Sequence, residues 1–429
     1  MDALPQDGPL FSFYGDDFTG STDALEALAR SGVNSVLFLH PPNDGERRQF
    51  AGYRGIGIAG DTRSRTPNQM RETLPAVFET LRRIGAPVVQ YKVCSTFDSS
   101  PEAGSIGCAL EVGRSVFDTR CVPVVAAAPM LRRYVAFGNL FAADGDDTFR
   151  IDRHPTMSCH PVTPMGEADL RRHLGKQTSC SVGLMDIVGL HAADAQERLS
   201  RTSSQAVLFD GLTEDDQVRA AQLIWNATHA PQVFAVGSSG FTYGMLSYWR
   251  NQGWLPPPRP SPPATASDRM LAMAGSCAPA TCRQICWALR NGFTGIRLNP
   301  AYPLDDTIVG QALTVLESGQ SVVVYSALGP GDCLEGTDRE GLASAMGRLL
   351  RAIAVRSGVR RVLVAGGDTS SHAVSQTGID ALSFLAPLAP GAPLCRAHGG
   401  ELDGLELVLK GGQVGCETFL VDVLRGEIE

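Results

Sequence analysis

The chain has 429 residues, of which 43% are apolar and 19% are charged, a composition typical of an α/β protein with two or three domains. Its formal net charge of −8 and the lack of a basic run give no electrostatic footprint for nucleic acid. The first ten residues lack the apolar region of a signal peptide, and no uninterrupted apolar run approaches the roughly 18 residues of a membrane span. We therefore expect a cytoplasmic protein with neither a nucleic-acid nor a membrane partner.

The 11 cysteines are scattered along the chain without the paired CxxC spacing of a zinc site. Cys282 and Cys286 lie one helical turn apart, but no nearby Cys or His pair completes a metal shell. Reduced thiols are expected, and no metal ligands are assigned.

The first structured stretch is 11–33. It predicts a short strand over 11–14, a turn with the adjacent carboxylates Asp16 and Asp17, and an amphipathic helix with Thr19 and Ser21 as candidate N-caps. Carboxylates at the C-terminal end of a strand occupy the position where open α/β sheets bind ligands. Alternatively, one aspartate caps the helix and the other is solvated.

Apolar runs then alternate with helical patterns through the first half of the chain. Buried strands are predicted at 33–40, 53–62, 87–95, 121–129, 180–188, 205–212 and 232–240. Crossover helices are predicted at 68–84 and 213–226. The near-continuous Val, Ile and Ala runs favour parallel sheets covered by helices on both faces.

Six prolines in 253–268 preclude helix and central strand and indicate a semi-rigid linker. Beyond it, strands are predicted at 270–278, 294–300, 321–327 and 361–368, with helices near 279–291 and 340–357. The sequence thus predicts two α/β domains, 1–252 and 269–429, each a mostly parallel sheet flanked by helices. We expect the active site in the cleft between them.

Two further strand ends in the first half carry polar side chains. Lys92 ends one predicted strand, and Ser95, Thr96 and Asp98 follow it in a loop. Arg63 follows another strand, and its guanidinium suits bidentate capture of a carboxylate. The alternatives are a solvated edge lysine and a surface salt bridge.

Glycine-rich turns end strands in the second half of the chain. No GxxxxGK[ST] motif occurs, and the one GxGxxG, at 55–60, lies within a predicted strand rather than in the strand–helix turn of a dinucleotide fold. Backbone amides, hydroxyls and helix N-termini at the other turns favour a polyphosphate site, although each turn could also be structural. The residues concerned are Ser276, Gly366, Gly367, Asp368, Thr369, Gly411, Gly412 and Gly415.

An ordered set of short motifs resembles the four-carbon acid sugar kinase family across nearly the whole chain. These motifs are DDFTGSTD, GDTRS, YKVCSTFDSS followed by GSIG, HPVTPM, GSCAPAT, VAGGDTS and GCETF. The resemblance implies an N-terminal domain for a sugar acid such as threonate, erythronate or 3-oxo-tetronate. It also implies a C-terminal domain for ATP, with Mg²⁺ bridging the phosphates.

The family's site residues can be carried over onto matching positions. Arg63 and Lys92 would bind the substrate carboxylate, while Asp16 and Asp98 would accept hydrogen bonds from its hydroxyls. Asp16 would orient or deprotonate the reacting hydroxyl. The resemblance also implies Ser95 and Thr96 in sugar-acid binding, and Ser276, Gly366, Gly367, Asp368, Thr369 and Gly415 in ATP binding. From their positions in the same turns we further expect Asp17 to bind the sugar acid and Gly412 to bind ATP.

Some features of the chain bear on which substrate of the family it uses. The sequence CSTFDS at 94–99 is similar to the corresponding motif of the 3-oxo-tetronate kinase branch. Two features depart from the family pattern: Asp368 occupies a position where many members have Glu, and residues 142–160 look divergent. His160 is a second candidate base. The alternative functions are an NAD-dependent sugar-acid dehydrogenase and a non-catalytic sugar-acid or nucleotide sensor. The expected partners are small molecules, and a homodimer is possible.

Overall fold

The computed structural model describes residues 4–159, 162–228, 231–258, 260–300, 303, 306–332 and 338–428. The chain forms two compact units. Unit 1 comprises Met1–Asp16, Ala27–Ser35 and Pro41–Arg259, and unit 2 comprises Asp17–Glu26, Val36–His40 and Pro260–Glu429. The expected domain limits, and a shared active site between the domains, stay predictions.

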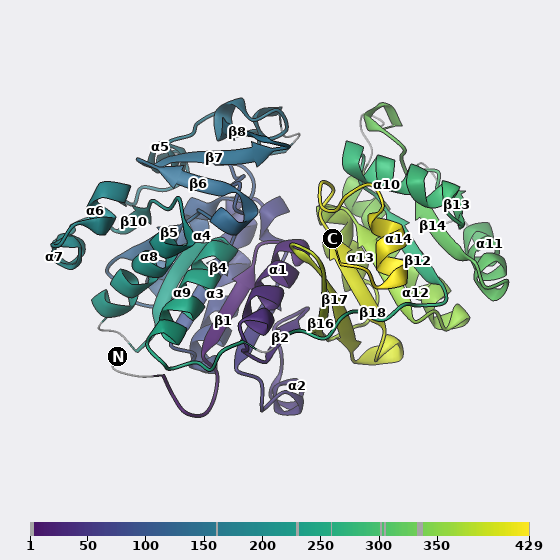
Figure 1. Ribbon diagram of the computed structural model, residues 1–429, viewed down its shortest axis with the longest axis horizontal. Helices are drawn as coiled ribbons and strands as arrows, with labels where there is room; N and C mark the ends of the chain where they lie inside the picture. The colour runs from purple at the N-terminus through teal and green to yellow at the C-terminus, as the bar shows by residue number, and fades with distance from the viewer. Residues whose placement is uncertain are drawn as a thin grey trace. The chain divides into compact units, whose positions relative to one another are not determined.

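Unit 1 is built on a parallel sheet with the strand order β3-β1-β4-β11-β5-β10-β9, flanked by helices (Figure 1). The strands are β1 (Phe11–Gly15), β3 (Gly55–Ala59), β4 (Val88–Lys92), β5 (Val122–Val125), β9 (Val182–Met185), β10 (Ala206–Phe209) and β11 (Val233–Gly237). The helices are α1 (Phe18–Arg30, shared with unit 2), α2 (Asp44–Gln49), α3 (Pro67–Ile84), α4 (Ile106–Val116), α5 (Leu170–Gly175), α6 (Ile187–His191), α7 (Ala195–Ser200), α8 (Glu214–Ala227) and α9 (Ser239–Asn251). The prediction of a mostly parallel sheet is confirmed.

A second, three-stranded antiparallel sheet also belongs to unit 1. It consists of β6 (Arg133–Ala136), β7 (Asn139–Asp144) and β8 (Asp147–Arg150). The sequence did not indicate it because β6 and β8 have no continuous apolar run: apart from the buried Val135, their side chains are partly buried or exposed.

The GxGxxG motif covers β3 and the residue that follows it, Gly60, so its first two glycines lie within the strand and not in a strand–helix turn. Its glycines make room for rings of the adjacent strand β1: a Cβ atom at Gly57 would lie 2.3 Å from the Phe13 ring, and one at Gly60 would lie 2.0 Å from Tyr14. The motif is therefore explained by packing within the sheet.

Unit 2 has a mixed sheet with the order β13-β14-β12-β15-β18-β17-β16-β2 (Figure 1). The first five strands are parallel, and β17 and β16 form an antiparallel hairpin that the sequence analysis missed. The strands are β2 (Ser35–Phe38), β12 (Met270–Ala274), β13 (Phe293–Arg297), β14 (Ser321–Tyr325), β15 (Arg361–Ala365), β16 (Ala381–Ala389), β17 (Ala392–His398) and β18 (Glu406–Lys410). The helices are α10 (Pro279–Arg290), α11 (Asp306–Glu317), α12 (Arg339–Ser357), α13 (Gly367–Ser375) and α14 (Phe419–Arg425).

Two chemical features bear on the expectations from composition. No helix in the described part of the chain is long and apolar enough to cross a membrane.

Nine of the described cysteines are free thiols, as expected, but Cys277 is disulfide-bonded, so the expectation of reduced thiols is wrong at this position.

A buried ion pair ties the proline-rich segment and the C-terminal helix to the sheet of unit 2. The fully buried Arg361 guanidinium donates to Glu406 Oε2 over 2.8 and 2.6 Å from the paired position on β18. It also donates to the carbonyls of Thr265 and Val423, each over 2.6 Å. The described residues of 253–268 form neither helix nor strand, as the prolines predicted.

Glu406→Ala should lower the free energy of unfolding by about 3–5 kcal/mol, because it leaves a buried cation without its counter-ion. The control is Glu401→Ala, which removes an exposed partner of Arg351 and should cost less than about 1 kcal/mol. Urea unfolding of both variants measures the difference. Equal costs would show that the Arg361 pair contributes no more than a surface pair.

Candidate functional site

In unit 1, neighbouring strands end in register at one edge of the sheet. Gly15 at the end of β1 pairs with Ala59 of β3 and with Lys92 of β4, and Lys92 pairs with Gly237 of β11. The residues that follow these strands must therefore meet at the carboxyl edge, where parallel sheets bind ligands.

Asp16 and Arg63 form a bidentate ion pair at this edge. Arg63 Nε lies 3.1 Å from Asp16 Oδ2, and Arg63 Nη2 lies 2.7 Å from Oδ1. The backbone N–H of Arg63 donates to the Asp16 carbonyl over 3.0 Å, and both side chains are largely buried. The structure thus brings together two predicted site residues, and Asp16 is not the solvated carboxylate of the alternative interpretation.

A glycine in the segment before α4 packs directly on the Arg63 turn. Gly104 has a φ of +62°, and a Cβ atom there would lie 2.6 Å from the Arg63 carbonyl oxygen. Its N–H donates to the Arg65 carbonyl over 2.9 Å. Only glycine combines this conformation with such a close approach.

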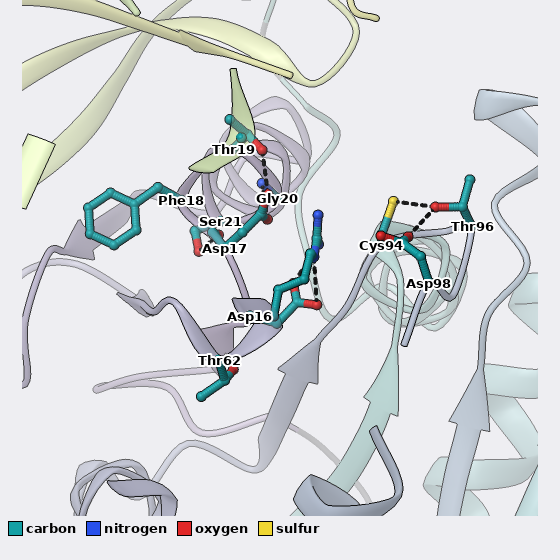
Figure 2. A network of polar contacts seen from close by, with 12 residues as sticks. Asp16, Asp17, Phe18, Thr19, Gly20, Ser21, Thr62, Cys94, Thr96 and Asp98 are labelled. Atoms are coloured by element: carbon teal, nitrogen blue, oxygen red, sulfur yellow. Dashed lines mark hydrogen bonds and ion pairs between the residues drawn. The ribbon is translucent and has the colours of Figure 1, made fainter. Parts of the chain in front are cut away.

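The loop after β4 carries the remaining predicted polar residues of unit 1 (Figure 2). The Thr96 hydroxyl lies 2.5 Å from Asp98 Oδ1 and 2.9 Å from Cys94 Sγ. Burial, followed by the Asp98 charge, raises the pKa of the Cys94 thiol, which favours its neutral form. Lys92 is 2% exposed, so it is not the solvated edge lysine of the alternative interpretation.

The backbone of this loop bends sharply at Phe97. This buried residue has a φ of +58°, a left-handed conformation that costs a non-glycine residue about 1–3 kcal/mol and is often found at functional sites. The packing around Phe97 must therefore contribute enough stability to hold its backbone in this conformation.

Behind the loop lies a buried polar group that the sequence analysis missed. His173 Nε2 lies 2.9 Å from Ser99 Oγ, and Gln177 Nε2 lies 2.9 Å from each of them. Gln177 also accepts the N–H of Gly107 at the start of α4. Burial lowers the pKa of His173 to about 4, so its imidazole is neutral at neutral pH.

In unit 2, Asp17 caps helix α1 (Figure 2). Asp17 Oδ1 accepts the N–H of Gly20 over 2.8 Å, and Oδ2 accepts the Thr19 hydroxyl over 2.6 Å. The expectation that Thr19 or Ser21 is the cap is therefore wrong, because the carboxylate of Asp17, directly before the helix, already accepts the helix N–H. A Cβ atom at Gly367, the first residue of α13, would lie 3.7 Å from Asp17 Oδ2.

Most of the predicted nucleotide residues converge at the carboxyl edge of the unit 2 sheet. The strands β12, β15 and β18 again end in register. Gly366 has a φ of +123°, and a Cβ atom there would lie 2.9 Å from Thr369 Oγ1 and 3.3 Å from Ser276 Cβ. A Cβ atom at Gly412 would lie 2.5 Å from Ser276 Oγ. We call Ser276, Gly366, Thr369 and Gly412 the glycine cradle.

The other predicted residues have different surroundings. Gly415 has a φ of +88° and packs on the Phe419 ring, and its carbonyl accepts from Gln284. The backbone of Asp368 is helical, while its side chain and His160 lie outside the described part of the structure.

Two residues next to the glycine cradle, Lys410 and Thr281, were not predicted from the sequence as site residues. The buried ammonium of Lys410 donates to Thr281 Oγ1 over 2.9 Å, and the Thr281 hydroxyl donates to the Gly412 carbonyl over 2.7 Å. The position of Lys410, as the last residue of a strand directly before Gly411, is the sequence signal that could have identified it.

Replacing His173 by Gln should reduce the loss of stability in acid. The pKa of His173 is lower in the folded chain, about 4, than in the unfolded chain, about 6.5. Its contribution to stability is therefore present above pH 6.5 and is lost as the pH falls toward 4. Between pH 7 and 5 the wild type should lose about 2 kcal/mol more than His173→Gln. Urea unfolding at both pH values measures this, and equal losses would contradict it.

Comparison with known proteins gives matches along both halves of the chain. A family model described as "Sugar-binding N-terminal domain" matches residues 11–245, and one described as "Nucleotide-binding C-terminal domain" matches residues 271–420. Solved structures from Salmonella typhimurium (TM-score 0.76, 96% of this chain and 98% of that one) and Haemophilus influenzae (TM-score 0.70, 95% and 98%) share the fold, each at 23% identity.

Two curated relatives are similar over almost their entire length. A 3-oxo-isoapionate kinase of Paraburkholderia graminis is 44% identical over 98% of this chain and 95% of its own. A 3-oxo-tetronate kinase of Pseudomonas savastanoi is 30% identical over 97% of each chain. Since both domain models match in order and such relatives cover nearly the whole sequence, the protein belongs to the four-carbon acid sugar kinase family.

Proposed function

We propose that the protein is an ATP-dependent kinase that phosphorylates a hydroxyl of a 3-oxo sugar acid. The observation that carries this proposal is the glycine cradle of unit 2, in a chain whose other half matches a sugar-binding family model. The relatives that are 44% and 30% identical are named as kinases of 3-oxo-isoapionate and 3-oxo-tetronate, which supports the 3-oxo class. The GxGxxG motif inside β3 gives the dehydrogenase alternative no support.

The sugar acid is assigned to the carboxyl edge of the unit 1 sheet. Arg63 and Lys92 supply the positive charge for its carboxylate, and Asp98 with Thr96 and Ser95 accepts or donates hydrogen bonds to its hydroxyls. Their burial strengthens these interactions, because little water competes for them.

Asp16 is assigned as the residue that orients the reacting hydroxyl and accepts its proton. The bidentate contact with Arg63 holds the carboxylate in one orientation. Phosphoryl transfer requires little covalent chemistry from the protein, so positioning the hydroxyl and neutralising charge are the main tasks.

The ATP phosphates are assigned to the glycine cradle and to the N-terminus of α13. Because Gly366 and Gly412 have no side chain, phosphate oxygens can approach the backbone amides closely. The helix dipole favours negative charge at the N-terminus of α13. Mg²⁺ binds carboxylate and phosphate oxygens and would lower the charge repulsion between nucleotide and acceptor. Asp17, beside Gly367, is the residue we assign to hold the ion or its water ligands.

An assay of ADP release with a panel of 3-oxo sugar acids, threonates and erythronates tests the function. The wild type should release ADP only with an acceptor, and fastest with a 3-oxo acid. Binding of both ligands without turnover would favour the sensor alternative instead.

In the same assay, Asp16→Asn should lower kcat by about 10²–10⁴-fold, the range of a lost general base, with little change in ATP affinity. The control is Asp61→Asn, which removes a carboxylate on the same turn that pairs with Arg65 and should leave kcat near wild type. A normal kcat for Asp16→Asn would restrict Asp16 to a structural role.

Gly412→Ala should weaken ADP binding by at least tenfold, because the new methyl group meets Ser276 Oγ and Ala278 Cβ within 3 Å and distorts the cradle. The adjacent Gly411→Ala is the matched control, since its Cβ atom would meet only Val414 at an ordinary 3.5 Å. Calorimetric titration with ADP compares the two variants. Equal affinities would show that the turn does not bind the nucleotide.

A further inference from the structure

Lysine is rare in this chain, and its positions are informative. Only three of the 37 Lys and Arg residues are lysines, namely Lys92, Lys176 and Lys410. Lys176 is exposed, whereas Lys92 and Lys410 are the last residues of two strands and are 2% and 0% exposed. Two lysines are thus found at the carboxyl edges where the two ligands are assigned.

The surroundings of Lys410 do not compensate its charge. Its ammonium group has three N–H donors, and its hydrogen-bond partner among the described residues is the neutral Thr281 hydroxyl. No described carboxylate forms an ion pair with it. Burial lowers the pKa of Lys410 to about 7, and among the described residues Cys282 of α10 acts in the opposite direction.

The ammonium lies at the start of helix α10, which is an unfavourable place for a cation. Thr281 is the third residue of this 12-residue helix, and the capping position, Ala278, offers no side-chain acceptor. A positive charge near a helix N-terminus is repelled by the helix dipole. The ammonium of Lys410 and the N-terminus of α10 would together attract an anion.

The hydrogen bonds lead from Lys410 to the cradle. Thr281 links the ammonium to the Gly412 carbonyl, and Gly412 packs on Ser276 Oγ. The carbonyl of Lys410 also accepts the N–H of Gly366 over 2.9 Å. The lysine is therefore connected to both glycine turns through its side chain and its backbone.

We propose that Lys410 is the charge-compensating residue of the nucleotide site, and that it neutralises a phosphate of the bound nucleotide as an ammonium held by Thr281. This inference rests on the proposed function and adds a residue to its nucleotide site. In the absence of nucleotide, Lys410 loses its proton readily. When a phosphate binds, the amine takes one proton from solvent and becomes the ammonium.

This role explains why a lysine occupies this position in a chain in which most basic residues are arginines. A guanidinium stays charged at any physiological pH, so burying it without a counter-ion would be costly. An amine can instead be neutral in the empty site and charged in the occupied one.

Calorimetric titration with ADP at pH 8, in two buffers of different ionisation enthalpy, tests the inference. The wild type should take up about 0.9 proton per ADP, because a group with a pKa of about 7 is about nine-tenths neutral at this pH. At pH 6 the uptake should fall to about 0.1 proton. Lys410→Met should abolish the uptake at pH 8 and weaken ADP binding roughly 10- to 100-fold.

Lys176→Met, at the exposed end of α5, is the matched control and should keep wild-type affinity and proton uptake. NMR of wild-type protein labelled at lysine Cε needs no variant. One of its three signals should titrate near pH 7 and should stop titrating there when ADP is added.

The possible outcomes separate the two proposals. Wild-type proton uptake in a folded Lys410→Met variant, or no titration near pH 7 in the NMR experiment, would overturn the role of Lys410 while leaving the kinase proposal intact. A wild type that binds no ADP would overturn the proposed function and this inference with it.

Discussion

The alignment of parallel strand ends in the sheets of the two units is the constraint on which both candidate sites depend. In unit 1, Gly15, Ala59 and Lys92 lie in register, and in unit 2, Ala274, Ala365 and Lys410 do so. Parallel pairing makes every strand leave the sheet at the same edge, so turns far apart in sequence meet there. Unit 1 places charged side chains at this edge, and unit 2 places glycines, hydroxyls and Lys410 there.

The buried charges of the molecule differ in how they are compensated, and this difference separates structural from functional roles. Arg361 has a carboxylate and two carbonyls as partners, so its charge is satisfied within the fold. The Asp16 carboxylate is compensated by the Arg63 guanidinium, which donates one hydrogen bond to each carboxylate oxygen. Lys410 has a hydroxyl, which cannot balance a full charge. A buried lysine without a charged partner among the described residues is a feature that packing alone does not explain, and it lies next to the glycine cradle.

The consecutive residues Asp16 and Asp17 show how neighbouring side chains of one type acquire different roles. Asp16 follows β1 and contacts Arg63 in the turn after the neighbouring strand β3, whereas Asp17 accepts the N–H of Gly20 and caps α1. The sequence alone left open which carboxylate, if either, was the cap, because both precede the helix by one or two residues. The direction of the chain as it leaves the strand decides the question.

The sequence by itself determined the parallel α/β class, most strands of both sheets and the ordered motifs of the family, because long apolar runs and glycine-rich turns are local signals. It did not indicate β6–β8 or the β16–β17 hairpin, whose strands are only partly buried or have irregular register. Nor could it find His173 behind Asp98 or Lys410 beneath Gly412. These residues depend on contacts between segments distant in sequence, and burial, which only the tertiary structure decides, sets their charge.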